Sequence, residues 1–275
     1  MKRKRPEVIK RLRPHLDKGA RRMADALLRA PDRPLNLCAV FARLLLFSFG
    51  RTGRRLILRE TIKEIYLTSL KGINVVIYTA LMLGVLVIVH ATQQLVKVQG
   101  EEFVGWLLVT LVVRELGPVW VAFFVLLHSG TAITVDLGNM SVTGEIEALR
   151  TMGIDPYRFL GFPRFWGLTI SLVALYVLTA FIAIIGGFLF AKIFSDIFWG
   201  DFWRSFLHAL EWVDLAVGFT RCIVFGMVIA TVSIYFGFKP KDKLGEVAQC
   251  TSTGAMLSLV LCASLDLLVV TIYYL

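Results

Sequence analysis

The chain has 275 residues, of which 57% are hydrophobic and 18% are charged, and its formal net charge is +10. Its mean hydropathy of +0.71 is too high for a soluble globular domain and is typical of a protein that crosses a membrane several times. The charge is uneven, because residues 1–71 contain 19 Lys and Arg against 6 Asp and Glu, whereas the remaining residues contain 11 against 14. Nucleic-acid binding is disfavoured, since no aromatic stacking platform or known nucleic-acid module accompanies the basic region.

The first 71 residues form a basic tail that we expect on the cytoplasmic side of the membrane. Residues 8–28 alternate apolar and basic positions at nearly helical spacing, and residues 35–49 form an apolar run that is too short to span and contains Arg43. Both segments predict helices that lie on the inner membrane surface, where anionic headgroups attract basic side chains. No removable signal peptide is recognisable, because residues 1–34 are charged throughout.

Five apolar stretches are long enough to cross the hydrocarbon layer, which takes about 20 helical residues. They are residues 72–91, 103–135, 165–191, 213–238 and 254–275. The sequence therefore predicts an all-α membrane protein with two parts, the basic tail with interfacial helices at 1–71 and a membrane domain at 72–275. The second stretch is too long for one upright span, and Gly117-Pro118 is the expected place of a kink.

Loop charges predict the orientation of these spans. The loops after the second and fourth spans are basic and contain Arg150, Arg158, Arg164, Lys239, Lys241 and Lys243. The opposite loops carry Lys97 and Arg204 among six acidic residues, which include Asp214. Because Lys and Arg favour the cytoplasmic side, we expect the N-terminus inside and, with five spans, the C-terminus in the periplasm.

Two opposite charges, Arg114 and Glu115, interrupt the second apolar stretch directly before the Gly-Pro pair. A charge at the centre of a spanning helix costs roughly 2.5–3.5 kcal/mol on insertion scales, so a chain with two adjacent charges is expected to use them. Their depth stays open from the sequence. The pair lies well inside the bilayer if the span starts at Phe103, and at the outer interface if it starts near Leu116.

The segment after the second span predicts a short cytoplasmic helix over about residues 143–152. Its polar residues suit the helix ends: Thr143 as N-cap, Glu145 and Glu147 at the N-terminal end, and Arg150 at the C-terminal end. Gly153 is expected to close the helix. The spacing of Ile146, Leu149 and Arg150 places them on one face. This face either packs against the same chain or docks into a cytoplasmic partner.

These residues belong to a longer ordered pattern. It comprises Arg114-Glu-Leu-Gly-Pro118, Gly130, Ala132, Asp136-Leu-Gly-x-Met140, Val142-Thr143, Glu145-Ile-Glu-Ala-Leu149, Met152-Gly-x-Asp-Pro156 and Phe162-Pro-Arg164. The pattern resembles that of the MlaE/YrbE family, the permease subunits of bacterial ABC transporters that work with MCE-domain proteins to move lipids between inner and outer membranes. The resemblance extends from about Leu35 to the C-terminus and makes residues 72–275 an MlaE-like permease domain.

The resemblance implies a homodimeric, multi-pass permease in the bacterial inner membrane, with a lipid-filled cavity between the two copies. Its implied partners are a cytoplasmic ATPase dimer docked on residues 143–150, a periplasmic MCE-domain protein and a phospholipid. The ATPase would bind ATP and Mg²⁺, so no cofactor, metal or catalytic residue is expected in this chain, and it is not expected to be an enzyme. By matching position, Arg114, Glu115 and Pro118 lie at the cavity and Gln93 lies near its outer mouth.

Two positions depart from the family pattern. His128 stands where the family usually has Arg, and Gly144-Glu145 stands where it usually has two side chains of the Glu or Gln type. His128 is either a neutral packing histidine or a titratable substitute at the cavity. Gly144 is expected to weaken the cytoplasmic helix, because glycine costs about 0.5–1 kcal/mol relative to alanine inside a helix.

The remaining polar residues leave alternatives open. Asp266 in the fifth span is either paired with Arg221 of the fourth as a structural contact or part of the transport path. An intramembrane lipid-modifying enzyme that uses Glu115, His128 and Asp266 as acid and base groups is the alternative function. A passive scaffold for other envelope proteins is a third.

Overall fold

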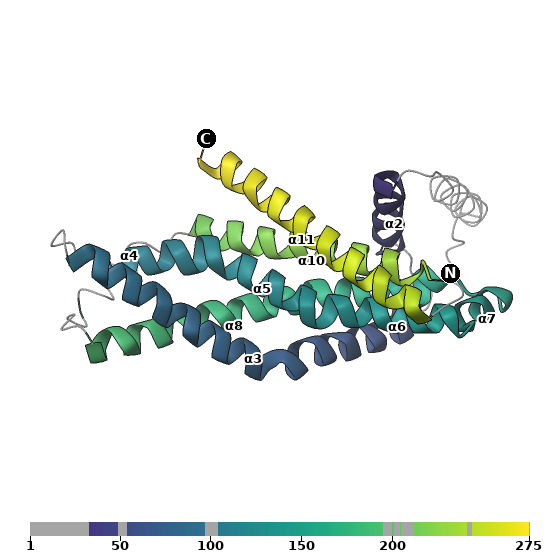
Figure 1. The fold of residues 1–275 in the computed structure, drawn as a ribbon, viewed down its shortest axis with the longest axis horizontal. Helices are drawn as coiled ribbons and strands as arrows, with labels where there is room; N and C mark the ends of the chain where they lie inside the picture. Colours follow the sequence, from purple (N-terminus) through teal and green to yellow (C-terminus); the bar gives the residue numbers. More distant parts are fainter. Residues whose placement is uncertain are drawn as a thin grey trace, which may run out of the picture. The chain divides into compact units, whose positions relative to one another are not determined.

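The computed structural model describes residues 33–48, 54–96, 104–194, 212–240 and 244–274, together with residues 200 and 204. Within these residues the chain is helical and has no strand (Figure 1). Five helical segments are long and apolar enough to span a membrane, which confirms the predicted all-α class with five spans. The chain divides into two units, residues 1–52 and 53–275, and each is described by itself.

The first unit contributes helix α2 (Arg33–Ser48). This helix confirms the helical prediction for residues 35–49, and Arg43 lies over the Phe47 ring, 5.8 Å from its centroid. Such a contact covers the charge of Arg43 with an aromatic face one turn away. The predicted helix at 8–28 falls outside the described residues, and the membrane-surface location of both segments stays a prediction.

The second unit contains the spans. Three are single helices: α3 (Arg54–Val96), α10 (Trp212–Gly237) and α11 (Leu244–Tyr274). The third span consists of a π-helical turn, η4 (Tyr157–Gly161), followed directly by α8 (Phe162–Phe194). Helix α3 runs without interruption through residue 71, so the boundary predicted there falls inside a helix. Its 43 residues extend about 65 Å at 1.5 Å per residue, about twice the hydrocarbon thickness. Helix α3 is therefore too long to fit upright within the hydrocarbon layer.

The second span is a succession of five short helical elements without a break. In order they are α4 (Val104–Leu108), η2 (Val109–Leu116), α5 (Gly117–Val125), η3 (Leu126–Gly130) and α6 (Thr131–Val142). Segments η2 and η3 are π-helical, and the N–H of Gly117 accordingly donates to the carbonyl of Val112, five residues back. Such wide turns are rare and occur often at functional sites. The sequence predicted a kink at Gly117-Pro118, and the structure has a change from π-helix to α-helix there.

Small residues set the distances between these helices. A Cβ at Gly84 of α3 would overlap the Ala183 carbonyl of α8, and a Cβ at Gly187 of α8 would lie 2.9 Å from Ile88 of α3. A Cβ at Gly130 or Gly138 would likewise crowd Ile229 of α10 or Val247 of α11. These glycines of the second span therefore allow α10 and α11 to approach it closely.

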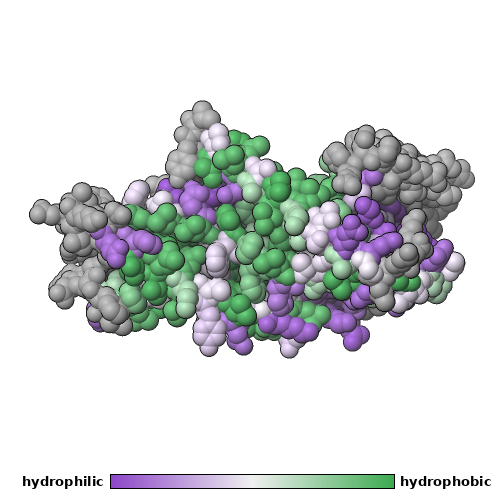
Figure 2. Space-filling view, in the orientation of Figure 1, coloured by the Kyte–Doolittle hydropathy of each residue, from purple (hydrophilic) through white to green (hydrophobic). Residues whose placement is uncertain are grey.

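Helix α11 differs from the other spans in its burial. Only 6% of its apolar window is buried, against 39–50% for the other four spans, and Figure 1 shows its C-terminal half leading away from α10. In Figure 2, hydrophobic side chains cover much of the middle of this face, and hydrophilic ones lie along its edges and toward its right end. This pattern matches a bundle whose middle faces lipid.

Alanine at Gly84 tests the packing of α3 on α8. The added Cβ meets a backbone carbonyl, which cannot rotate away, so we expect Gly84→Ala to lower the stability by about 1–3 kcal/mol. Gly245→Ala is the matched control, because a Cβ there meets nothing within 4 Å and alanine favours a helix. Thermal unfolding of the detergent-solubilised protein measures both variants. An unchanged midpoint for Gly84→Ala would contradict the close contact.

Candidate functional site

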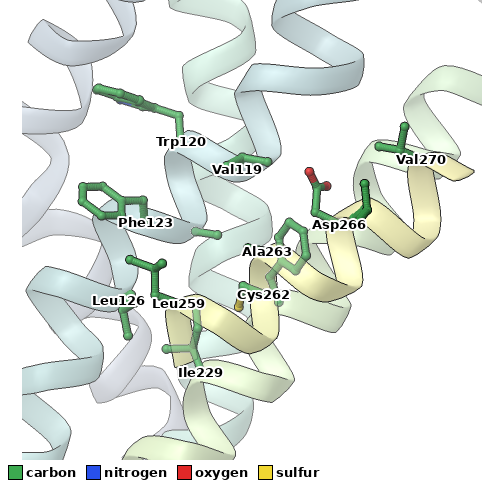
Figure 3. Close-up of a pocket in the computed structure, with 13 residues that line it drawn as sticks. Val119, Trp120, Phe123, Leu126, Ile229, Leu259, Cys262, Ala263, Asp266 and Val270 are labelled. Carbon is green, nitrogen blue, oxygen red and sulfur yellow. The ribbon is translucent and has the colours of Figure 1, made fainter. Parts of the chain in front are cut away.

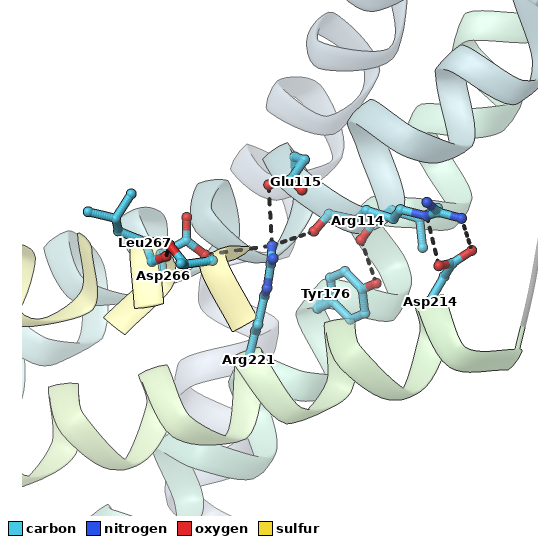
Figure 4. A network of polar contacts seen from close by, with 9 residues as sticks. Arg114, Glu115, Tyr176, Asp214, Arg221, Asp266 and Leu267 are labelled. Atoms are coloured by element: carbon cyan, nitrogen blue, oxygen red, sulfur yellow. Dashed lines mark hydrogen bonds and ion pairs between the residues drawn. The ribbon is translucent and has the colours of Figure 1, made fainter. Parts of the chain in front are cut away.

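Arg114 is held by a second charged residue that lies 100 positions away in the chain. Its Nε lies 2.7 Å from Asp214 Oδ1, and its Nη2 donates to Asp214 Oδ2 at 2.8 Å, so the guanidinium and the carboxylate form a two-point contact (Figure 4). Asp214 is fully buried near the start of α10, with its side chain 0% exposed. This bidentate geometry is the strongest form of such a pair. It accounts for how the second span tolerates Arg114.

Arg221 of α10 is the second buried cation, and it connects three helices (Figure 4). Its Nη1 donates to the backbone carbonyl of Arg114 at 2.7 Å. The same nitrogen lies 3.4 Å from Glu115 Oε2 and 3.6 Å from Asp266 Oδ1 of α11. The Arg221 side chain is 1% exposed, and a cation buried this deeply requires compensating charge. The two carboxylates supply it.

The backbone around Pro118 explains why donors gather here. Proline lacks an N–H and leaves a carbonyl of the preceding turn without its helical donor, and a membrane provides no water to replace it. The Tyr176 hydroxyl of α8 donates to the Val113 carbonyl at 3.0 Å, and Arg221 donates to the Arg114 carbonyl. Two side chains of other helices thus donate to carbonyls of the π-helical segment η2.

An apolar pocket adjoins this network between α5, α10 and α11. It has a volume of about 630 Å³, within the range of about 300–1,000 Å³ usual for ligand sites. Figure 3 shows Trp120 and Phe123 of α5 on one side and Cys262, Ala263 and Asp266 of α11 on the other. Among the thirteen described residues that line the pocket, Asp266 alone carries a charge. The pocket can hold a hydrocarbon chain with a polar group at the Asp266 end.

The structure brings some of the residues predicted for the cavity together and separates others. Arg114 and Glu115 both contact Arg221, which also contacts Asp266. Gln93 lies on the exposed side of α3 near its C-terminal end, outside the contacts described here.

His128 of η3 is 13 residues beyond Glu115, about 20 Å along a helix. Its ring stacks on Phe124 at 5.6 Å between centroids, and its Nδ1 lies 3.3 Å from Ser129 Oγ. Glu115, His128 and Asp266 therefore do not form one cluster of acid and base groups.

The cytoplasmic helix expected at about 143–152 is helix α7 (Glu145–Thr151), and its start corrects one prediction. Gly144, rather than Thr143, is the N-cap of α7, and Thr143 is the C-cap of α6. Gly144 has a φ of +81°, a left-handed conformation that glycine adopts without strain. The predicted weakening of α7 by Gly144 is therefore wrong, because glycine suits this turn. Gly153, with a φ of +76°, closes the helix as predicted.

The faces of α7 differ in exposure. Ile146 is 5% exposed and packs against the same chain. Glu145, Glu147 and Arg150 are exposed and Leu149 is partly buried. The hydroxyl of Thr143 donates to Glu145 Oε1 at 3.1 Å. Helix α7 thus has one apolar anchor and a charged outer face that is available to another protein.

Sequence reasoning missed Tyr176 and misassigned Asp214. Asp214 was grouped with the acidic residues of an outer loop, but it lies within α10 and is buried. Its position two residues into a predicted apolar span was a usable signal. Tyr176 and the pocket residues gave no signal, because an aromatic residue in an apolar span is usually packing.

The sequence also matches a known family of proteins. The family model described as Permease MlaE matches residues 61–272, which covers most of the chain and every element of the charged network and the pocket. The chain belongs to the MlaE permease family. It is therefore a multi-pass membrane protein of a transporter family.

Relatives of this MlaE-family permease are distant but cover most of its length. The intermembrane phospholipid transport system permease protein MlaE of Haemophilus influenzae is 24% identical over 78% of this chain and 82% of its own length. A probable ABC transporter permease protein of Rickettsia felis is 25% identical over 83% and 90%. One from Synechocystis is 24% identical over 76% and 78%.

The substitution Tyr176→Phe tests the hydrogen bond from the Tyr176 hydroxyl to the Val113 carbonyl in this MlaE-family permease. Tyr176→Phe leaves the Val113 carbonyl without its hydroxyl donor, and we expect a loss of about 1–3 kcal/mol in stability. Tyr78→Phe removes a hydroxyl from a side chain that is 73% exposed and should have little effect. Thermal unfolding in lipid nanodiscs compares the two. Equal stability of both variants would show that the Tyr176 hydroxyl does not support η2.

Proposed function

We propose that the chain is the permease subunit of an ABC transporter that moves phospholipids between the inner and outer membranes of a bacterium. It would lie in the inner membrane, with its N-terminus in the cytoplasm and its C-terminus in the periplasm. The apolar pocket between α5, α10 and α11, with Asp266 at its polar end, is the observation that carries this proposal. The names of the relatives, which include phospholipid transport and ABC transporter permease, support it.

The pocket suits one acyl chain of a phospholipid. Its walls are aromatic and aliphatic on the α5 and α10 sides and mostly aliphatic on the α11 side, so an acyl chain can leave the bilayer without exposure to water. The headgroup would then lie toward Asp266 and the charged network. The side chains of Arg114, Glu115 and Asp266 are 18%, 28% and 22% exposed, so a headgroup can reach all three.

Arg114 can bind a headgroup phosphate directly only if its contact with Asp214 changes. An arginine can bind a phosphate through two nitrogens, but in this conformation Nε and Nη2 of Arg114 both contact Asp214. A phosphate would have to share or replace that contact. The network therefore acts first as the polar wall of the cavity, and a phosphate contact would accompany a rearrangement of α10 against η2.

A separate ATPase supplies the energy in this proposal. The exposed charges of α7, Glu145, Glu147 and Arg150, form the docking surface. Helix α7 follows α6 after two residues, and α6 continues α5 and the pocket wall through η3. A displacement of α7 therefore acts on the same helical span that lines the pocket.

A second copy of the chain would complete the cavity. Helix α11 exposes large apolar side chains along its length, including Met256, Leu259, Val260 and Leu267. Its outer surface is available for packing against the second copy, which would enclose the pocket between the two permeases. An MCE-domain protein at the periplasmic end would receive or deliver the lipid.

A lipid-modifying enzyme fits the geometry less well. Catalysis by acid and base groups requires the groups to reach one reacting centre, and His128 lies about 20 Å along the helix from Glu115. Glu115 and Asp266 share the guanidinium of Arg221 instead. This arrangement neutralises charge and leaves no ordered pair of nucleophile and base.

Blocking the pocket tests the proposed function. A tagged chain is purified with its co-purifying ATPase and MCE-domain protein, and the complex is reconstituted in vesicles with a fluorescent phospholipid. Ala263→Phe places a ring at the exposed wall of the pocket, and we expect ATP-dependent lipid movement to fall severalfold. Ala248→Phe, on an exposed position of the same helix outside the pocket, is the matched control and should transport normally.

The same measurement on the wild-type complex tests whether the protein is a transporter. Absence of an ATPase from the purified complex, or of any ATP-dependent lipid movement, would contradict the proposal and favour a scaffold. Normal transport by Ala263→Phe would place the lipid path elsewhere.

A further inference from the structure

A third buried arginine lies at the end of the bundle near α7, away from the pocket network. Arg164 is 7% exposed at the third position of α8, although its sequence context predicted a loop. Its Nε lies 3.2 Å from Glu64 Oε1 of α3, and its Nη2 donates to Asp136 Oδ2 of α6. One guanidinium thus contacts carboxylates on two other helices.

The packing around Arg164 holds α8 directly against α3. A Cβ at Gly167, one turn after Arg164, would lie 2.7 Å from the Glu64 Cβ, so no side chain separates the two helices there. The Ser171 hydroxyl donates to the Ile65 carbonyl at 3.4 Å. The position of the arginine relative to α3 is therefore set by backbone contact as well as by charge.

The pair of Asp136 and Arg164 closes the segment that contains α7. Asp136 precedes α7 on α6, and Arg164 follows it on α8, so the contact joins the two helices from which this segment projects. The end of α6 is also attached to the chain after α10, because the Ser141 hydroxyl donates to the Pro240 carbonyl at 2.5 Å. A displacement of α7 therefore pulls or pushes on helices that are joined at Arg164.

We propose that Arg164 is a positioning residue that transmits the movement of α7 to α3 through its contacts with Asp136 and Glu64. This inference rests on the proposed function, in which an ATPase acts on α7. With the contacts intact, α6, α8 and α3 move together when the ATPase acts. Without the contact to Asp136, α7 and α6 move while α8 and α3 lag, and ATP is hydrolysed without a full change of the cavity.

The test measures lipid moved per ATP hydrolysed in the reconstituted complex, together with its ATP hydrolysis rate. Asp136→Asn removes one charge from a side chain that is 57% exposed, and Glu64→Gln removes the other. We expect each to lower the lipid moved per ATP at least about fivefold, the lower end of usual coupling between sites. The hydrolysis rate, the amount of bound ATPase and the unfolding midpoint should stay near wild type.

Two control variants separate coupling from general effects. Asp136→Glu keeps the carboxylate and should retain the wild-type ratio. Glu60→Gln removes a carboxylate from the same helix as Glu64, but one that contacts only the exposed Lys63 at 3.9 Å among the ion pairs described, and surface pairs of this kind contribute little. It should also leave the ratio unchanged.

The other outcomes overturn the inference in distinguishable ways. An unchanged ratio in both Asp136→Asn and Glu64→Gln shows that Arg164 does not couple the helices. A loss that accompanies reduced ATPase binding, a lower unfolding midpoint or failure to assemble shows that Arg164 only stabilises the fold. A wild-type complex that moves no lipid with ATP contradicts the proposed function, and the inference fails with it.

Discussion

The hydrogen bonding of the backbone beside Pro118 is the constraint on which the rest of the bundle depends. A helix in a membrane has no water to satisfy a carbonyl that proline leaves without a donor. Tyr176 and Arg221 donate to the carbonyls of Val113 and Arg114, which ties α8 and α10 to the second span. Once Arg221 is buried for this purpose, its charge requires Glu115 and Asp266, and the contact with Asp266 brings α11 to the same point. The position of four helices thus follows from one interrupted turn.

The same constraint places the polar groups beside the apolar pocket. Asp266 forms an ion pair with the buried Arg221 and also lines the pocket. A lipid headgroup in the pocket would therefore meet a residue that also joins α10 and α11. At the other end of the span, α6 leads into α7 after a glycine turn at Gly144. Of the two π-helical segments in this span, η2 carries the charged network and η3 lies between that network and α7. Such wide turns occur often at functional sites, and we expect the span to change its length or twist there.

Much of the fold could be predicted because membrane spans depend on composition and length. Five apolar stretches, the two charges within the second of them and the short helix after the second span were all readable along the chain. The partners of those charges were not, since Asp214 lies 100 residues from Arg114 and Tyr176 lies 63 residues from Val113. Local pattern also misplaced the N-cap of α7, because it favours a threonine side chain over a glycine whose φ is positive. The pocket was unpredictable for a simpler reason: its apolar residues look like any other lipid-facing side chains.

The proposed transport path requires that the pocket between α5, α10 and α11 holds the acyl chain of a lipid. Electron cryomicroscopy of the complete transporter in lipid nanodiscs can examine this pocket, because ordered lipid is visible beside the side chains that hold it. We expect elongated density between Trp120 and Phe123 on one side and Ala263 on the other, with its polar end at Asp266. A pocket filled by side chains of the second copy, with lipid density only on the outer surface of the bundle, would contradict it.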